Sequence, residues 1–197
     1  MRFRLWKVAM LLLFCVLISS CKTTVSINIP LSVLLKSTMV EVPIRMSSDT
    51  CAGGTDIKKL GMDVTTMLCD GAGGRWSGSI QLVDHNTKEM LLKQPLTIYH
   101  GSGNNIIIYI REDALKALEG QIDPSNVRFR IQFSNDTGVQ QEMYVRGIWV
   151  NGNPIGSEGG LLVVPPEVKL ELELSDVATT MLLINGMEGV GMFPYKE

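Results

Sequence analysis

The chain has 197 residues, with 18 basic and 20 acidic side chains and a formal net charge of −2. A chain of this length makes one domain or two small ones. Its mildly acidic balance lacks the basic surface that nucleic-acid-binding proteins need, so the composition argues against that class.

The first 20 residues have the pattern of an export signal. Arg2, Arg4 and Lys7 precede an uncharged apolar run at residues 8–18. A helix needs roughly 20 apolar residues to cross the hydrocarbon core of a bilayer, so this run is too short for a membrane span. A basic start followed by a short apolar run is typical of secretory signals.

The end of that run carries a motif. Ile18-Ser19-Ser20-Cys21 resembles the lipobox of bacterial lipoprotein precursors. The resemblance implies cleavage between Ser20 and Cys21 and lipid attachment to the Cys21 thiol, so the protein would be held on a membrane by its acyl chains. The alternatives are an uncleaved anchor, or an ordinary signal with a chance cysteine.

The residues after Cys21 refine this expectation. Lys22, in place of an aspartate, favours the outer membrane by the same resemblance, with the domain facing the periplasm. The inner membrane and the cell surface are the alternatives. The start of the predicted mature chain, Cys21-Lys22-Thr23-Thr24-Val25, also resembles uncharacterised prophage and plasmid lipoproteins.

Residues 21–197 are expected to form a single periplasmic α+β domain, with a possible internal boundary in the Gly-rich stretch 71–75. Without the three basic residues of the signal, this part has 15 basic and 20 acidic residues, a net charge of −5. Cys51 and Cys69 are its two remaining cysteines, and in an exported protein we expect them to form a disulfide worth about 3 kcal/mol. A metal or redox pair is the alternative, but it lacks a nearby histidine and a Cys-x-x-Cys spacing.

Polar and apolar residues alternate at 24–29, which predicts a strand beginning three residues from the lipid. Such a strand would hold the domain against the membrane surface, unless these residues form a short tether instead. Residues 31–38 are expected to be a short helix. Residues 40–46 alternate again, and Pro43 places this second strand at a sheet edge.

In the middle of the chain, Ile57, Leu60, Val64 and Leu68 have helical spacing and predict a helix over 57–70. Strands are expected at 76–83 and, interrupted by Pro95, at 89–99. The apolar run 106–110 indicates a strand buried on both faces, and a short helix follows at 112–118.

The last third alternates most clearly. Strands are predicted at 127–133 and 140–150, joined as a hairpin by a turn at 135–138, and at 168–174. Ser175 or Asp176 can cap a helix to about residue 184, before an extended apolar tail. The expected fold class is therefore α+β, mostly antiparallel β and sandwich-like, with three or four short helices.

No motif for catalysis or metal binding is found. Gly71-Ala72-Gly73-Gly74-Arg75 follows a predicted helix and precedes a predicted strand, the reverse of a phosphate-binding loop, so it is interpreted as a linker. His85 and His100 fall at predicted turns, without a strained Gly-x-Ser-x-Gly turn or zinc-ligand spacing. We expect no catalytic residue, no metal and no cofactor.

Met181, Met187 and Met192 gather near the C-terminus with Val190 and Phe193. They are expected either to fill the core or to form an apolar surface for a partner. The favoured function is a non-enzymatic, lipid-anchored envelope protein that binds another envelope protein, as an assembly accessory or a phage- or plasmid-type exclusion factor. The alternative is a carrier with an apolar cavity for lipid or another hydrophobic ligand, and a third hypothesis is a hydrolase using His85 or His100.

Overall fold

A computed structural model describes residues 22–35, 40–49, 64–70, 73–84, 95–100, 105–118 and 123–193. The predicted signal peptide, Cys21, Cys51 and His85 lie outside these residues, and so do the predicted elements over 57–63 and 89–94. The helices and strands named next all belong to the described ranges.

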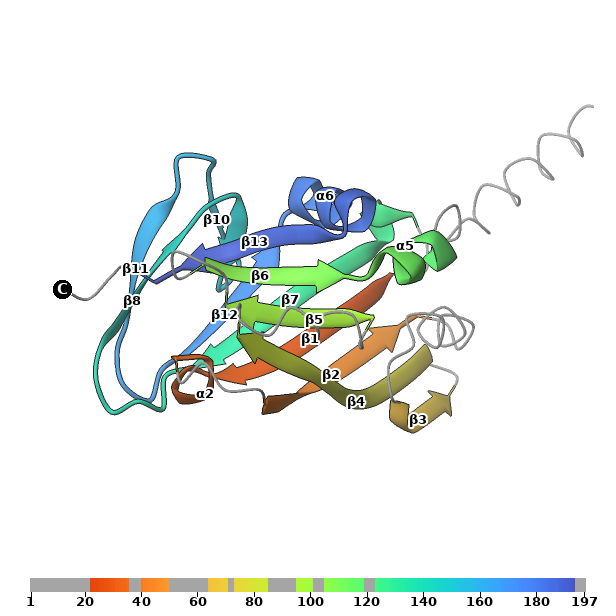
Figure 1. Ribbon diagram of the computed structural model, residues 1–197, viewed down its shortest axis with the longest axis horizontal. Helices are drawn as coiled ribbons and strands as arrows, with labels where there is room; N and C mark the ends of the chain where they lie inside the picture. Colours follow the sequence, from red (N-terminus) through yellow and green to blue (C-terminus); the bar gives the residue numbers. More distant parts are fainter. Residues whose placement is uncertain are drawn as a thin grey trace, which may run out of the picture.

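The described strands form one 13-stranded sheet, with the path β10-β9-β12-β7-β1-β2-β4-β5-β6-β13-β8-β11 and β3 beside β4. Figure 1 shows this sheet curling around a common interior. The strands are β1 Thr23–Pro30, β2 Val40–Ser48, β3 Val64–Asp70, β4 Gly73–Asp84, β5 Leu96–His100, β6 Asn105–Ile110, β7 Val127–Ser134, β8 Gln141–Val145, β9 Ile148–Val150, β10 Asn153–Ile155, β11 Gly160–Val164, β12 Lys169–Leu174 and β13 Met187–Met192.

The two ends of this path are joined by one bent hairpin. Strands β8 and β9 are successive lengths of one segment, and β10 and β11 return along it in antiparallel register. At its far end the hairpin pairs β9 with β12, while near its start it pairs β8 with β13. Gly147 makes the bend with a φ of 62°, and its N–H donates to the Gly156 carbonyl at 3.1 Å.

This connection overturns the expected fold class. A sandwich needs two separate sheets packed face to face. Here a single sheet curls until the bent hairpin belongs to both of its ends, so the described fold is mostly β and nearly closed. The sequence pattern could not distinguish the two, because alternation gives a buried and an exposed face in either arrangement.

The interior is apolar and comes from alternate residues of the strands. Val25, Ile27 and Ile29 of β1 are buried, and the strands predicted at 24–29, 127–133 and 168–174 are confirmed. The run 106–110 behaves differently from the prediction. Ile107 and Tyr109 are half-buried while their neighbours are buried, so β6 buries one face rather than two.

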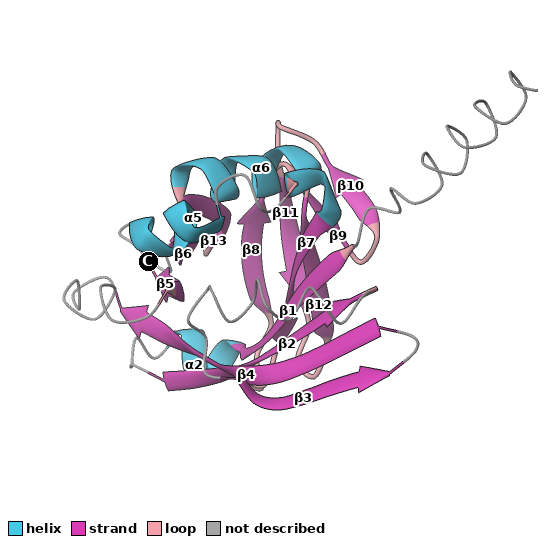
Figure 2. Cartoon of the chain, turned by 90° about the vertical axis from the view of Figure 1, so that its right-hand side faces the viewer, coloured by secondary structure: helices cyan, strands magenta, loops and turns pink. Residues whose placement is uncertain are grey.

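Three α-helices and a 3₁₀ turn accompany the sheet: α2 Leu31–Leu35, α5 Glu112–Leu118, α6 Asp176–Asn185 and η2 Pro124–Asn126. Figure 2 shows α5 and α6 at one end of the curled sheet and α2 at the other. Helix α6 contacts β6 and β13 on one side and β7 and β12 on the other, so it covers that end of the curled sheet.

The predicted boundaries of α6 are confirmed. The Ser175 hydroxyl accepts a hydrogen bond from the Ala178 N–H at 3.2 Å, which caps the first turn. Gly186 ends the helix in the left-handed region, and its N–H donates to the Leu182 carbonyl. These local signals hold because capping chemistry depends on neighbours in the sequence.

Two predictions about β2 and β7 are wrong. Strand β2 lies between β1 and β4, not at an edge. Its ladder with β1 ends at the Ile27–Ile44 pair, so Pro43 lies beyond that ladder and removes no bond to β1. Strand β7 pairs with β1 and β12 instead of β8, because the 135–140 turn leads β8 to a different part of the sheet.

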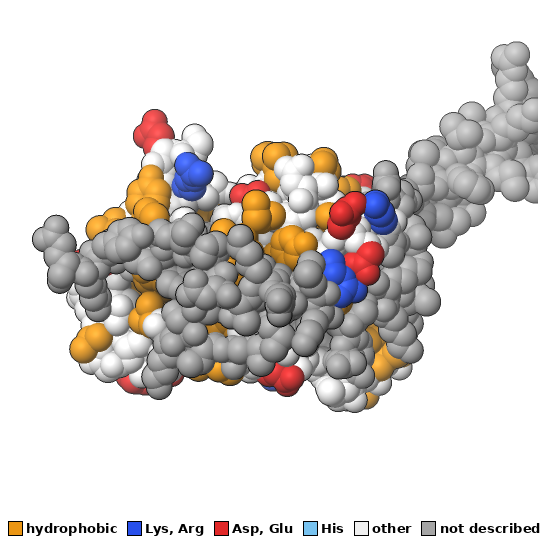
Figure 3. Space-filling model, viewed as in Figure 1, with side chains coloured by type: hydrophobic (Ala, Val, Ile, Leu, Met, Phe, Trp, Pro, Cys, Tyr) orange, Lys and Arg blue, Asp and Glu red, His pale blue; other side chains and the backbone are white. Residues whose placement is uncertain are grey.

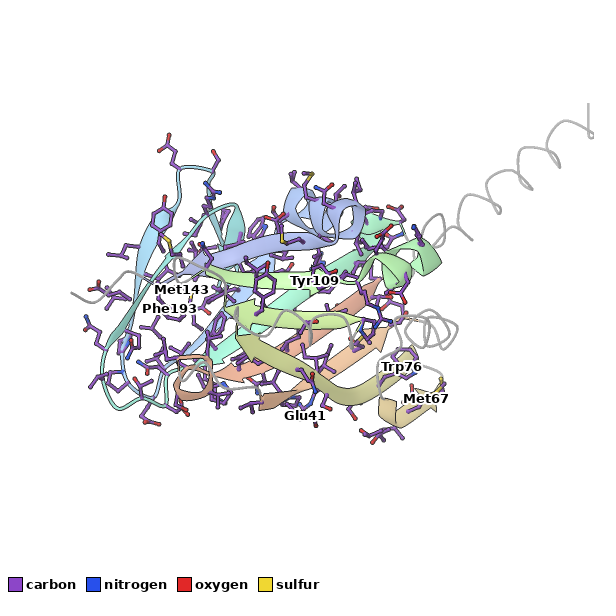
Figure 4. The ribbon with its side chains drawn as sticks, in the orientation of Figure 1. Glu41, Met67, Trp76, Tyr109, Met143 and Phe193 are labelled. Atoms are coloured by element: carbon purple, nitrogen blue, oxygen red, sulfur yellow. The ribbon has the colours of Figure 1, made fainter. Side chains whose placement is uncertain are left out.

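The helix predicted over 57–70 is wrong for its described part, since 64–70 is β3, antiparallel to β4. The glycines that follow belong to structure rather than to a linker. Gly73 and Gly74 are the first residues of β4, and a Cβ on Gly74 would meet the Trp76 ring at 2.0 Å. Glycine therefore allows the buried indole to lie against its own strand, at the β3 end of the sheet (Figure 4).

Candidate functional site

The outward face of α6 is apolar. Val177, Met181 and Ile184 follow one another at spacings of four and three, and their side chains are 73, 43 and 66% exposed. The opposite face carries Thr179 and Leu182, both buried. A surface helix usually directs polar residues to solvent, so this helix presents an apolar stripe with nothing described above it.

The stripe continues into β13. Met187 follows the helix cap and is half exposed, and its sulfur accepts a hydrogen bond from the Tyr99 hydroxyl at 3.2 Å. We call Val177, Met181, Ile184 and Met187 the α6 surface. Figure 3 shows hydrophobic side chains gathered over α6 and β13 on this side of the molecule.

Charged side chains of α5 border the α6 surface. Helix α5 is adjacent because Gly186, at the end of α6, lies against Leu115 and the Ile110 carbonyl. Lys116 pairs with Glu112 at 2.7 Å and holds the pKa of that carboxyl below its usual value. An apolar centre with a charged rim is the usual composition of a protein-binding surface.

Two titratable groups near β13 are shifted by burial. Burial raises the pKa of Glu188, and the charge of Arg146 opposes that rise. Burial also raises the pKa of Tyr99, with a smaller contribution from Tyr109. Both shifts favour the neutral form of the side chain.

The methionines predicted to act together are divided by the structure. Met181 and Met187 belong to the α6 surface, whereas Met192 lies at the far end of β13, opposite Tyr144 of β8. All three are exposed, so their interpretation as core packing is wrong.

The other residues singled out in the sequence do not form a described site. Ser20, Cys21 and Cys51 lie outside the described residues, and Cys69 lies in β3. Lipid attachment at Cys21 and the Cys51–Cys69 disulfide therefore stay predictions. His100 ends β5, and His85 falls outside the described ranges.

The described residues lack two further kinds of feature. They contain no group of three or more His, Cys, Asp or Glu side chains placed to hold a metal ion. Within the same ranges, no helix has the length and apolar character needed to cross a membrane.

Sequence reasoning missed Val177 and Ile184. A signal was present, because α6 reads DVATTMLLIN and has apolar residues around most of its circumference. A single buried stripe accounts for only some of these apolar residues, so the others have to face outward. Which of them face outward depends on how α6 packs against the sheet.

The family model described as a domain of unknown function, DUF7424, matches residues 18–197. No curated protein and no solved structure matches the chain. The matched range contains every described helix and strand, and the chain belongs to the DUF7424 family.

Proposed function

We propose that this member of the family is a lipid-anchored envelope protein that binds another envelope protein through its α6 surface. Its role would be that of an assembly accessory or of a phage- or plasmid-type exclusion factor. Cys21 would carry the lipid in the outer membrane, with the domain facing the periplasm.

The α6 surface is the observation that supports this proposal. An apolar stripe that costs free energy in water is stabilised when a partner covers it, at about 25 cal/mol per Å² of apolar area. Methionine adapts to varied partner surfaces, and two of the four residues are methionines. From Val177 to Ile184 the stripe spans eight residues of helix, or about 10 Å.

The described interior favours this function over the carrier. A carrier needs an enclosed apolar cavity. The interior side chains of β1, β2, β6, β7 and β12 belong to a single cluster of buried residues, which supports a filled core. Apolar side chains directed outward then serve a partner rather than an enclosed ligand.

The test is site-specific crosslinking in bacteria that express the full gene. A photoreactive residue replaces Met181 in one strain and Val139 in another. Val139 is a matched control because it is an equally accessible apolar side chain, in the turn that contacts α2 through Ser32 and Asp136. We expect one dominant adduct with an envelope protein from position 181 and none from position 139.

A second variant separates binding from folding. Ile184→Glu adds a charge at the centre of the α6 surface, while Val139→Glu adds the same charge at the control turn. We expect Ile184→Glu to abolish the adduct from position 181 with unchanged protein level. Equal adducts from both positions, or an adduct that survives Ile184→Glu, would reject α6 as the binding surface.

A further inference from the structure

Two parallel rows of outward-facing residues cross the wall formed by β12, β7, β1, β2, β4 and β3. The strand registers align Glu173, Arg130, Ser26, Arg45, Ser77 and Thr66 in the first row. They align Arg128, Thr24, Ser47, Arg75 and Leu68 in the second. The rows therefore bring four arginines, distributed from residue 45 to residue 130, onto one face.

The arginines form two unlike pairs. On β7, Arg130 donates to Glu173 at 2.6 Å and Arg128 lies 3.7 Å from the same carboxylate. On β2 and β4, by contrast, Arg45 and Arg75 are exposed, and no described acidic side chain lies within ion-pair distance of either. Within the described residues, the β2–β4 half of the face therefore carries two arginines without an ion-pair partner.

Hydroxyl-bearing and apolar residues surround the two arginines. A groove of about 330 Å³ is lined by Ser26, Ser47, Ser77 and Thr66, together with Arg45, Arg75, Met46, Trp76 and Leu68. Arg45 stands opposite Ser77, so Arg75 is its diagonal neighbour, at about 7–8 Å between the residues. Two guanidinium groups at that separation can bind one phosphate group, and the hydroxyls can donate further hydrogen bonds to it.

Three acidic residues of the described ranges are close to the groove in sequence or register, and none of them lines it. Glu41 lies near the start of β2, before Arg45, where it accepts a hydrogen bond from the Ser79 hydroxyl at 3.2 Å (Figure 4). Asp49, at the end of β2, accepts from the Lys22 N–H at 3.3 Å. Asp70 ends β3 opposite Gly73, beyond the second row.

The groove is also close to the predicted lipid attachment. Thr24 of the second row is three residues from Cys21, and an extended chain reaches at most about 3.6 Å per residue. The rows therefore lie within about 11 Å of that cysteine along the chain. If Cys21 carries the acyl chains, this face is the part of the domain placed beside the lipid headgroups.

We propose that the Arg45–Arg75 groove binds the phosphate of an anionic lipid headgroup and docks this face on the membrane that holds the anchor. The orientation assigned here rests on the lipid attachment of the proposed function, whereas the binding itself does not. Residues 21–197 carry a net charge of −5, so the groove presents positive charge on a chain that is acidic overall.

The test uses residues 21–197 with Cys21→Ser, which contain every described element but carry no lipid. Binding is measured to vesicles of phosphatidylcholine with and without phosphatidylglycerol. We expect binding only to the anionic vesicles, weakened by added salt, and reduced about tenfold or more by Arg45→Gln with Arg75→Gln. Arg146→Gln, an exposed arginine outside both rows, is the matched control and should leave binding unchanged.

Other outcomes overturn the proposal. Absence of binding to the anionic vesicles rejects it, as does an equal loss with Arg146→Gln, which would indicate unspecific charge attraction. Binding of inorganic phosphate by calorimetry, dependent on Arg45 and Arg75 but without vesicle binding, would assign the groove to a soluble anion instead. Circular dichroism of each variant checks folding. Because the chain tested carries no lipid, its failure is separate from a failure of the anchor.

Discussion

The α6 surface and the arginine rows are opposite in construction as well as in chemistry. The α6 surface is apolar and comes from residues 177–187, one short stretch of chain. The arginine rows are positively charged and combine six strands from residue 24 to residue 173. A local pattern is enough to make the first, whereas the second exists only through strand register.

The two surfaces also face different ways. Figures 1 and 2 both place α6 and β3 on opposite sides of the molecule. If the Arg45–Arg75 groove lies on the membrane, α6 is directed away from it. This arrangement would hold the domain close to the lipid and still leave the α6 surface open to a partner.

The largest effect is expected inside α6, where the two faces of one helix can be compared. Leu182 is fully buried, so Leu182→Ala should lower the free energy of unfolding by about 2–5 kcal/mol. Ile184→Ala, on the exposed face, should change it by no more than about 0.5 kcal/mol. Urea unfolding of both variants measures the difference, and similar losses would mean that Ile184 contributes to the core.

A smaller effect is expected from the arginines. Arg130 should matter more for stability, and Arg45 should matter more for binding to vesicles. Arg130→Gln removes a partly exposed ion pair with Glu173 and should lower stability by up to about 1 kcal/mol. Arg45→Gln removes no described ion pair and should leave the free energy of unfolding nearly unchanged. Binding to anionic vesicles should instead suffer more from Arg45→Gln. If the same variant caused the larger loss in both assays, the arginines of β7 and those of β2 and β4 would not have separate roles.

The smallest effect concerns Glu188, which follows Met187 in β13. Burial raises its pKa, so the folded protein holds this proton more tightly than the unfolded chain does. Stability therefore falls as the pH rises through the titration of this carboxyl. Glu188→Gln should be slightly more stable than wild type at pH 7 and equal to it at pH 3, measured by thermal unfolding. A less stable variant at pH 7 would show that the attraction of Arg146 outweighs burial.

The parts of the fold that were predicted correctly depend on neighbours in sequence. Alternation identified β1, β7 and β12, and capping residues identified both ends of α6. The spacing of Val64 and Leu68 suited a helix, but that stretch pairs with β4, and Leu68 is exposed. The pairing with β4 determines the structure of this stretch, and the residue pattern within 64–70 does not indicate that pairing.

The same limit applies to the candidate surfaces. Met181 and Met187 were recognised from composition, but whether they lie in the core or on the surface depends on how α6 packs against the sheet. Arg45, Arg128 and Arg130 alternate with apolar residues, which predicts that they face outward, whereas Arg75 falls in the stretch that was interpreted as a linker. That they share a face follows only from the parallel pairing of β1 with β7 and the antiparallel pairing of β2 with β1 and β4.

The central claim is that a lipid on Cys21 holds the domain at a membrane, because the orientation proposed for both surfaces depends on it. The intact mass of the protein made from the full gene in bacteria tests this claim most directly. We predict a chain that begins at Cys21, carries acyl chains, and is two hydrogens lighter than the reduced form because Cys51 and Cys69 are bonded. A chain that keeps residues 1–20 and carries no lipid would contradict the anchor, and with it the orientation proposed for both surfaces.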